Sequence, residues 1–318
     1  MKANTRVNMT VNVAGLDLRT PILVASGTYG WGTEFDEIEG YSSDAIGAVI
    51  LKGTTLEPRD GNRTPRIVET AGGAGILNSI GLQNPGVDTV VREYLPRLKG
   101  LKAKVVANVA GATAEDYGAV TRKLAAHERI DAVEVNVSCP NVKHGGMQFG
   151  ADASLCAEVV ALCRKATGKP LIVKLSPNVT DIRPIARAAI DAGADALTVA
   201  NTYLGTAIDV RTRKAILGNV SGGLSGPAIK PLALQKVMEV ARMLREAKRA
   251  TPVIASGGIM TGEDALEFMI AGARAVMLGT VLFADPHAPA RILGEMQALL
   301  AELGVRDVND LVGTLRLP

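Results

Sequence analysis

A cysteine in the middle of the chain stands where it could do acid–base chemistry. Cys139 lies in the segment VSCPNVKHGG, directly after the apolar run Ala132 to Asn136. Pro140 stops regular strand pairing and a glycine pair permits movement, so the thiol would lie at a strand end on an adaptable loop. A thiol in that position is a candidate general base. Free cysteine is also among the most buried residue types, so a small core thiol remains an open alternative on this segment alone.

The segments that must position this thiol alternate in a regular way. Short runs rich in Val, Ile and Leu precede longer segments of helical period, which is typical of a parallel sheet built from βα units. Eight runs are present, the number that closes a (β/α)₈ TIM barrel. The predicted strands are Pro21 to Ala25, Ala45 to Leu51, Lys104 to Val109, Ala132 to Val137, Pro170 to Leu175, Ala196 to Ala200, Pro252 to Ala255 and Ala275 to Leu278. The predicted helices are Ala114 to Glu128, Ala153 to Thr167, Ile182 to Ala192, Ala228 to Arg249, Gly262 to Ala271 and Ala288 to Leu303.

Two segments fall outside this alternation. Thr10 to Val13 and Leu16 to Leu18 flank Ala14-Gly15 and predict a short N-terminal β-hairpin at the barrel floor. A long insertion, Gly53 to Gly100, follows the second strand, and loops of this length are usually functional. We expect residues 1–318 to form a single α/β barrel domain.

The composition excludes several classes of protein. The net charge is +3 with scattered lysines and arginines, so the basic surface of a nucleic-acid binder is not expected. No run approaches about 18 apolar residues and no secretory signal opens the chain, which predicts a cytoplasmic protein without a membrane segment. Three cysteines and three histidines lack disulfide or metal-ligand spacing, so no metal site is expected. Cys156 and Cys163 share a helical pattern and are predicted to lie in the core.

Polar residues follow most of the predicted strands, at the end where a barrel builds its active site. Lys52 and Lys174 lie in or beside apolar runs and would be costly to bury unless an anion or acceptor meets them. Either lysine could instead pair with a carboxylate below the site. With Asn108, Asn136 and Asn201 at the same mouth, the set favours an anionic ligand with amide-like edges, such as a pyrimidine carboxylate.

Glycines in the last loops have a different use. The segment GGLSGP, residues 222–227, is expected to open a long helix, and Gly257-Gly258 and Gly279-Thr280 end the seventh and eighth strands. Backbone N–H groups in such loops, together with a helix N-terminus, commonly bind a phosphate in barrels. These segments predict a cofactor or substrate that carries a phosphate.

With these segments together and in order, the sequence resembles the class 1 dihydroorotate dehydrogenases, the FMN enzymes of pyrimidine synthesis, over nearly the whole chain. The matching segments are ASGT from Ala25, LKGT from Leu51, NSIGLQN from Asn78, NVSCPN from Asn136, Asn201-Thr202, GGLSG from Gly222 and Gly279-Thr280. The segments NSIGLQNPG and NVSCPNVKHGG are most similar to class 1B. The membrane-bound class 2 enzymes have serine in place of Cys139 and an N-terminal membrane helix.

The resemblance implies roles for individual residues. Cys139 would take the proton from C5 of dihydroorotate while a hydride passes from C6 to FMN, and Lys52 would assist at the same catalytic site. Lys174 would stabilise the negative charge of the reduced flavin. The implied FMN contacts are Ser26, Lys52, Gly53, Asn108, Asn136, Lys174, Ala200, Gly226, Gly257, Gly258, Gly279 and Thr280. The implied substrate contacts are Lys52, Asn78, Ser79, Ile80, Gly81, Leu82, Asn136, Asn141, Asn201 and Thr202.

The resemblance also implies a partner. A class 1B catalytic chain works with an electron-transfer subunit that carries FAD and a [2Fe-2S] cluster and passes electrons to NAD⁺. Cysteine spacing for a cluster and a GxGxxG segment after a strand are both missing here. The expected assembly is a heterotetramer built on a homodimer of the catalytic chain. A class 1A homodimer that uses fumarate is the alternative within the family.

Other functions remain open at this point. A second flavin barrel, such as a dihydropyrimidine dehydrogenase-like domain or a tRNA dihydrouridine synthase, would share the loop cysteine. A flavin-free aldolase would use Lys174 as a Schiff-base amine. A binding barrel without catalysis would make no use of Cys139.

Overall fold

A closed parallel β-barrel forms the centre of the protein. The computed structural model describes residues 7–138 and 146–317, and its barrel strands follow the order β10-β15-β16-β3-β4-β7-β8-β9. The strands are β3 (Ile22–Val24), β4 (Ala48–Ile50), β7 (Lys104–Val109), β8 (Ala132–Asn136), β9 (Leu171–Lys174), β10 (Ala196–Val199), β15 (Val253–Ser256) and β16 (Ala275–Leu278). All eight predicted strands are confirmed, and so is the TIM-barrel fold.

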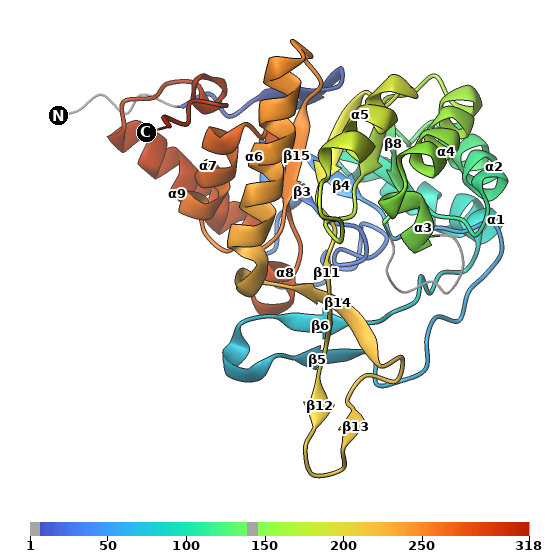
Figure 1. The fold of residues 1–318 in the computed structure, drawn as a ribbon. Helices are drawn as coiled ribbons and strands as arrows, with labels where there is room; N and C mark the ends of the chain where they lie inside the picture. The colour runs from blue at the N-terminus through green and yellow to red at the C-terminus, as the bar shows by residue number, and fades with distance from the viewer. Residues whose placement is uncertain (1–6, 139–145, 318) are drawn as a thin grey trace.

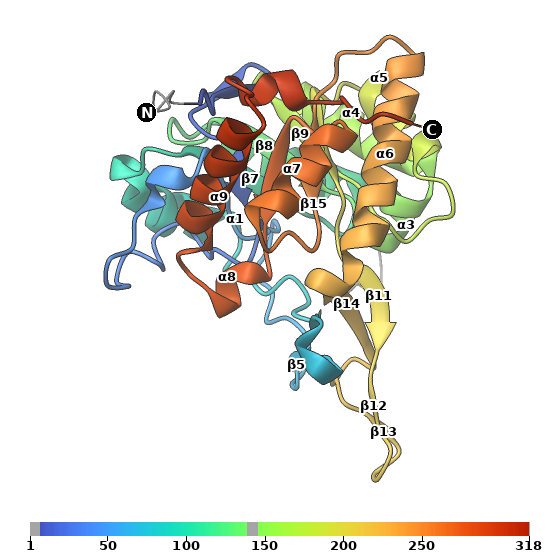
Figure 2. The same ribbon diagram turned by 90° about the vertical axis from the view of Figure 1, so that its left-hand side faces the viewer.

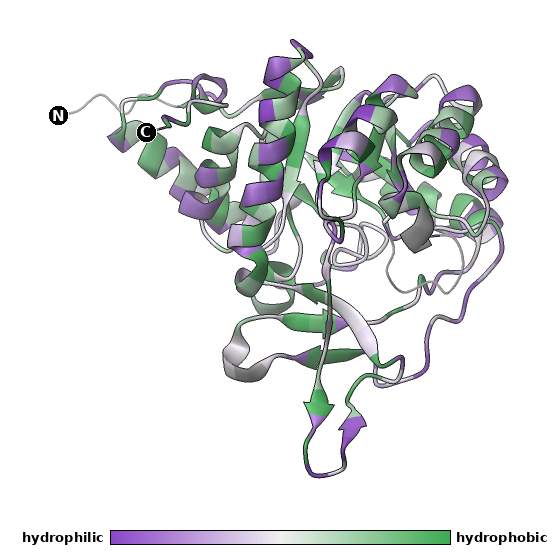
Figure 3. Cartoon of the chain, in the orientation of Figure 1, coloured by the Kyte–Doolittle hydropathy of each residue, from purple (hydrophilic) through white to green (hydrophobic). Residues whose placement is uncertain are grey.

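Helices cover the outside of this barrel (Figure 1). They are α1 (Val87–Thr89), α2 (Ala114–Ala125), α3 (Gly146–Ala151), α4 (Ala153–Ala166), α5 (Arg183–Asp191), α6 (Lys230–Glu246), α7 (Gly262–Ala271), α8 (Val281–Ala284) and α9 (Ala288–Glu302). The six predicted helices correspond to α2, α4, α5, α6, α7 and α9, with ends that differ by a few residues. Figure 3 shows mostly hydrophobic barrel strands and hydrophilic residues that recur along the helices. This pattern arises because parallel strands are buried on both faces, whereas each helix buries only one stripe.

The predicted N-terminal hairpin is present. It pairs β1 (Val11–Val13) with β2 (Leu16–Leu18) in antiparallel register, and its four apolar side chains are buried. Leu18 lies against Gly47, the residue before β4, where a Cβ would stand 3.2 Å from the Leu18 Cβ. The hairpin therefore covers the amino-terminal end of the barrel, opposite the strand ends that were expected to carry chemistry.

A second sheet was not predicted. It has the order β11-β14-β6-β5 and consists of β11 (Tyr203–Thr206), β14 (Ser221–Ser225), β6 (Ile76–Asn78) and β5 (Ile67–Glu69). A hairpin of β12 (Ile208–Asp209) and β13 (Lys214–Ala215) extends beyond it. In Figures 1 and 2 the sheet and the hairpin project from one end of the barrel, while the marked chain ends lie toward the other. The long insertion thus supplies β5 and β6, two strands of a lid-like sheet over the barrel mouth.

One prediction about this region is wrong. Gly222 and Gly223 were expected in a loop that opens a helix, but they lie inside β14. A Cβ at Gly222 would stand 2.4 Å from the carbonyl oxygen of Asn78 on β6, so glycine is required where the strands approach closely. The helix α6 begins later, after a 3₁₀ turn over Pro227–Ile229.

A buried tyrosine links helix α2 to the end of β8. The Tyr117 hydroxyl donates a hydrogen bond of 2.9 Å to the carbonyl of Asn136, and the side chain is 1% exposed. We expect Tyr117→Phe to lower the free energy of unfolding by about 1 kcal/mol, because a buried hydrogen bond is lost without a large change in packing. Urea denaturation followed by circular dichroism measures this.

Tyr203→Phe is the matched control for that variant. Its hydroxyl is buried without a hydrogen-bond partner in the described part of the chain, so removing it should cost nothing. Equal losses for both variants would contradict a specific contribution of the hydrogen bond between Tyr117 and Asn136.

Candidate active site at the barrel mouth

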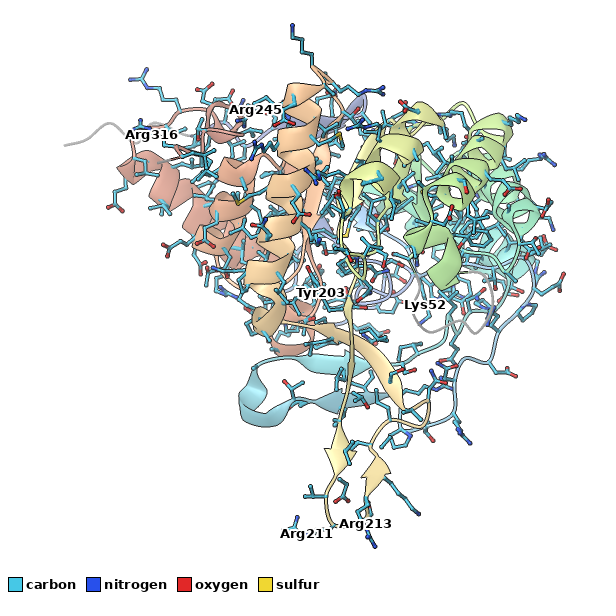
Figure 4. The ribbon with its side chains drawn as sticks, viewed as in Figure 1. Lys52, Tyr203, Arg211, Arg213, Arg245 and Arg316 are labelled. Atoms are coloured by element: carbon cyan, nitrogen blue, oxygen red, sulfur yellow. The ribbon has the colours of Figure 1, made fainter. Side chains whose placement is uncertain are left out.

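A cavity of ≈ 400 Å³ lies between the carboxyl ends of the barrel strands and the second sheet. In this fold the carboxyl ends of the strands are where ligands bind, and the volume is that of an ordinary small-molecule site. Figure 4 shows Lys52 on the side of the barrel that faces the second sheet. The cavity is therefore walled by the barrel below and by the insertion above.

Most of the residues predicted for a site line this one cavity. They are Ser26, Lys52, Gly53, Asn78, Ile80, Gly81, Leu82, Asn136, Lys174, Ala200, Asn201, Thr202, Gly226, Gly257, Gly258, Gly279 and Thr280. Asn108 and Ser79 are buried next to lining residues rather than among them. Cys139 and Asn141 lie outside the described residues.

The sequence reasoning missed the apolar rim of the cavity. Ile67 and Phe283 line it although their side chains are 51% and 58% exposed. Ile67 belongs to the unpredicted sheet, and Phe283 lies on the short helix α8. The only signal in the sequence was the position of Phe283, three residues after Thr280 in a segment that was already predicted to bind.

Two lysines bring positive charge to the cavity. Neither Lys52 nor Lys174 forms a direct ion pair, with nitrogen and oxygen within 4.0 Å, with a carboxylate of the described residues, so the alternative of a direct structural ion pair is not supported there. Lys174 is 6% exposed, and a buried cation without a partner favours an anionic or carbonyl-bearing ligand. Burial lowers the pKa of Lys52, with Glu34 opposing that shift and Arg66 adding to it.

Asn136 and Asn201, which line the cavity, and the buried Ser138 beside them orient one another. Asn201 Nδ2 donates to the Ser138 hydroxyl at 2.8 Å and to Asn136 Oδ1 at 3.3 Å, and the Ser138 hydroxyl donates to the same Oδ1 at 3.2 Å. Because Asn136 Oδ1 is used as an acceptor, its amide NH₂ remains available to a ligand. The Asn136 NH₂ is therefore presented to the cavity in a fixed position.

The opposite end of the cavity is built from backbone. Gly226, Gly257 and Gly258 have φ values of 98°, 134° and 74°, which only glycine adopts readily. A Cβ at Gly258 would stand 2.7 Å from the backbone nitrogen of Lys230, so the backbone there cannot carry a side chain. The Thr280 hydroxyl donates to the Ser225 hydroxyl at 2.8 Å and joins the last strand to the second sheet. Backbone N–H groups that no side chain covers, next to the hydroxyls of Thr280 and Ser225, are suited to bind a phosphate.

The two cysteines of α4 lie where the sequence predicted them. Cys156 and Cys163 are buried on α4, as expected for core residues, and burial raises the pKa of each thiol to about 12. Within residues 7–138 and 146–317, no three His, Cys, Asp or Glu side chains gather as a metal site would require. No helix in those same ranges is both long and apolar enough to cross a bilayer.

The fold and the cavity define a (β/α)₈-barrel protein with a candidate ligand site at the carboxyl ends of its strands. A sequence profile described as dihydroorotate dehydrogenase matches residues 8–300. This chain belongs to the dihydroorotate dehydrogenase family.

Close relatives carry one common name. The "dihydroorotate dehydrogenase B (NAD(+)), catalytic subunit" of Desulforamulus reducens is 51% identical over 98% of this chain and 100% of its own length. The protein of the same name from Geobacter sulfurreducens is also 51% identical, over 98% of this chain and 99% of its own. The similarity to each relative extends over nearly the whole of this chain, barrel and insertion together.

The shifted pKa of Lys52 has a measurable consequence. We expect the Lys52 ammonium to titrate below the usual lysine value of about 10.4, since burial disfavours its charged form. Affinity for a carboxylate ligand should then fall as the pH rises through this lowered pKa. NMR of ¹³C-labelled lysine side chains, assigned with Lys52→Met, measures it, and a titration at or above about 10.4 would contradict the effect of burial.

Proposed function

We propose that this chain is the catalytic subunit of an NAD⁺-linked dihydroorotate dehydrogenase and oxidises dihydroorotate to orotate in pyrimidine synthesis. The observation that carries the proposal is an identity of 51% over 98% of the chain to relatives of that name, combined with a cavity that gathers most of the expected site residues. No observation favours the fumarate-linked class or an aldolase over this function.

The described residues fit FMN as the cofactor. Asn108 Oδ1 is a buried acceptor without a partner in the described part of the chain, Lys174 is a buried cation at the cavity, and the glycines at 226, 257 and 258 leave bare backbone for a phosphate. These residues would hold FMN together with Ser26, Gly53, Asn136, Ala200, Gly279 and Thr280. When bound, FMN would accept the hydride that leaves C6 of dihydroorotate.

Lys52, Asn136 and Asn201 would bind the substrate. The Lys52 ammonium would pair with the carboxylate of dihydroorotate, and the amides of Asn136 and Asn201 would bind the ring amides. Asn78 is held in place by its hydrogen bond of 3.2 Å from Nδ2 to the carbonyl of Gly223. The segment Ser79 to Leu82 and Thr202 would complete the binding site. Hydrogen-bonding groups in fixed positions would hold the dihydroorotate ring in the orientation that the reaction requires.

Cys139 would remove the proton from C5. Its role rests on the sequence, since the residue lies outside the described ranges. As the thiolate takes this proton, the C5–H electron pair forms the C5–C6 double bond and the hydride departs from C6. Lys174 would place its positive charge beside the site that receives the two electrons, and a preorganised cation stabilises charge that develops during reaction.

The two electrons taken from dihydroorotate must be passed on to an acceptor outside this chain. The name of the relatives, catalytic subunit, fits a second subunit, which we propose carries FAD and a [2Fe-2S] cluster and reduces NAD⁺. With three cysteines that lack cluster spacing, this chain would depend on that partner. The proposed assembly is a heterotetramer around a homodimer of the catalytic chain.

Anaerobic mixing with dihydroorotate tests the proposed function. The purified chain, alone and with a co-expressed partner, should hold a flavin whose absorbance bleaches on addition of dihydroorotate. Reoxidation by NAD⁺ only in the presence of the partner would support the proposal, whereas reoxidation by fumarate would assign the other class. A bound flavin that does not bleach would overturn the substrate assignment.

Cys139→Ser tests the base directly. We expect flavin reduction by dihydroorotate to slow by about 10²–10⁴-fold, as for loss of a general base, while orotate still binds. Stopped-flow absorbance measures the rate. Cys163→Ser, at a buried core thiol, serves as the control and should leave the rate unchanged, whereas an unaltered rate in Cys139→Ser would remove it from the mechanism.

Gly258→Ala tests the proposed phosphate end of the cavity. The variant should bind FMN at least tenfold more weakly, because its φ of 74° and the nearby Lys230 backbone leave no room for a Cβ. Gly294→Ala on α9, where nothing lies within 4 Å of the added methyl, should bind FMN normally. Equal affinity in both variants, measured by fluorescence titration of the apoprotein, would place the phosphate elsewhere.

A further inference from the structure

Glu134 is a carboxylate at the centre of the barrel. It lies on β8, two residues before Asn136 and so on the same face of the strand, and its side chain is 0% exposed. Asn108 Nδ2 donates to Oε1 and the Thr198 hydroxyl donates to Oε2, each at 2.7 Å. Both donors are neutral, and a buried charge held in this way is costly. Because this carboxylate does not favour folding, we looked for a role of Glu134 in the site above it.

The first role concerns the orientation of Asn108. A carboxylate only accepts hydrogen bonds, so Asn108 must turn its NH₂ toward Glu134 and its Oδ1 away. That oxygen is buried and accepts no hydrogen bond from the described residues. It lies 3.0 Å from the position of a Cβ at Gly53, which lines the cavity. Glu134 therefore fixes which edge of the amide faces the cavity wall.

The second role concerns Lys174. The hydrogen bond between Glu134 and Thr198 crosses β9, which lies between β8 and β10 and carries this lysine. Glu134 is in register with Ile172, and Lys174 is two residues further on the same face, in register with Asn136 and Thr198. The carboxylate thus lies diagonally below the lysine, one layer deeper in the barrel. Both side chains are buried, so their charges are screened less than surface charges would be.

We propose that Glu134 is a positioning residue for the cofactor of the proposed reaction. It holds the Asn108 carbonyl toward the cavity, and its negative charge offsets part of the positive charge of Lys174. The reduction potential of bound flavin is thereby kept lower than Lys174 alone would set it, which eases the onward transfer of electrons. This inference rests on the proposed function because it requires FMN in the cavity.

Glu134→Gln isolates the charge. The Gln Oε1 can still accept from Asn108. Its NH₂ can donate to the Thr198 hydroxyl, which then accepts a hydrogen bond instead of donating one. The shape of the side chain and the orientation of Asn108 are therefore kept. We expect flavin reduction to become about tenfold more favourable, equal to about 30 mV for a two-electron couple. Equilibration with a reference dye measures the potential. Glu158→Gln, at an exposed carboxylate on α4, makes the same charge change and should leave the potential unaltered.

Glu134→Met and Asn108→Leu test the orientation. Each should weaken FMN binding to the apoprotein about tenfold, and the double variant should lose little more, because the two residues act as one unit. Fully additive losses would overturn the positioning role. If Glu134→Met does not fold, the potential of Glu134→Gln decides the matter, since a potential equal to that of the unaltered chain overturns the inference.

The inference and the proposed function fail in different ways. If dihydroorotate bleaches the flavin of the unaltered chain but Glu134→Gln keeps its potential, only the inference falls. If the unaltered chain binds no flavin, the proposed function falls and the inference falls with it.

Discussion

Closure of the parallel barrel is the constraint on which the rest of the structure depends. The ladder of hydrogen bonds that joins β16 to β3 and β10 to β15 completes the circle of strands. Because every strand runs in the same direction, residues far apart in the sequence meet at one end of that circle. Lys52 after β4, Asn136 on β8 and Lys174 on β9 reach the same cavity only through this closure. The second sheet then covers the mouth and adds Asn78 from the insertion.

The barrel interior departs from an apolar core in one cluster of side chains. Asn108, Glu134 and Thr198 form a buried polar group where most strand residues are Val, Ile, Leu or Ala. Burying a carboxylate among neutral donors opposes folding, and aliphatic side chains of the same volume would often be as stable or more so. We therefore explain this cluster by its effect on the cavity above it, where Glu134 orients the Asn108 amide and offsets part of the charge of Lys174.

The sequence predicted the barrel well and the second sheet not at all. The barrel strands are short apolar runs whose burial on both faces leaves a clear signal, and Lys104–Val109 matches its predicted bounds. β14 is Gly-rich and β6 is only three residues long, and both form because residues 76–78 pair with 223–225 across the chain. Local patterns carry no trace of such a long-range pairing, which is why Gly222 was assigned to a loop.

The site shows the same division. Residues at strand ends could be found from the sequence, since the fold fixes where strand ends meet. Glu134 was overlooked as part of an apolar run, although a lone charge inside a fully buried strand was the signal that marked it. The contribution of Ile67 to the apolar rim depends on how the second sheet is placed, and that sheet was not predicted.

A crystal structure of the chain with FMN and orotate would test the central claim most directly. The account predicts the orotate carboxylate within hydrogen-bond distance of the Lys52 ammonium, the ring against Asn136 and Asn201, and the FMN phosphate at Gly257 and Gly258. Orotate bound away from Lys52, or a phosphate held elsewhere, would contradict the account of how the barrel builds this site.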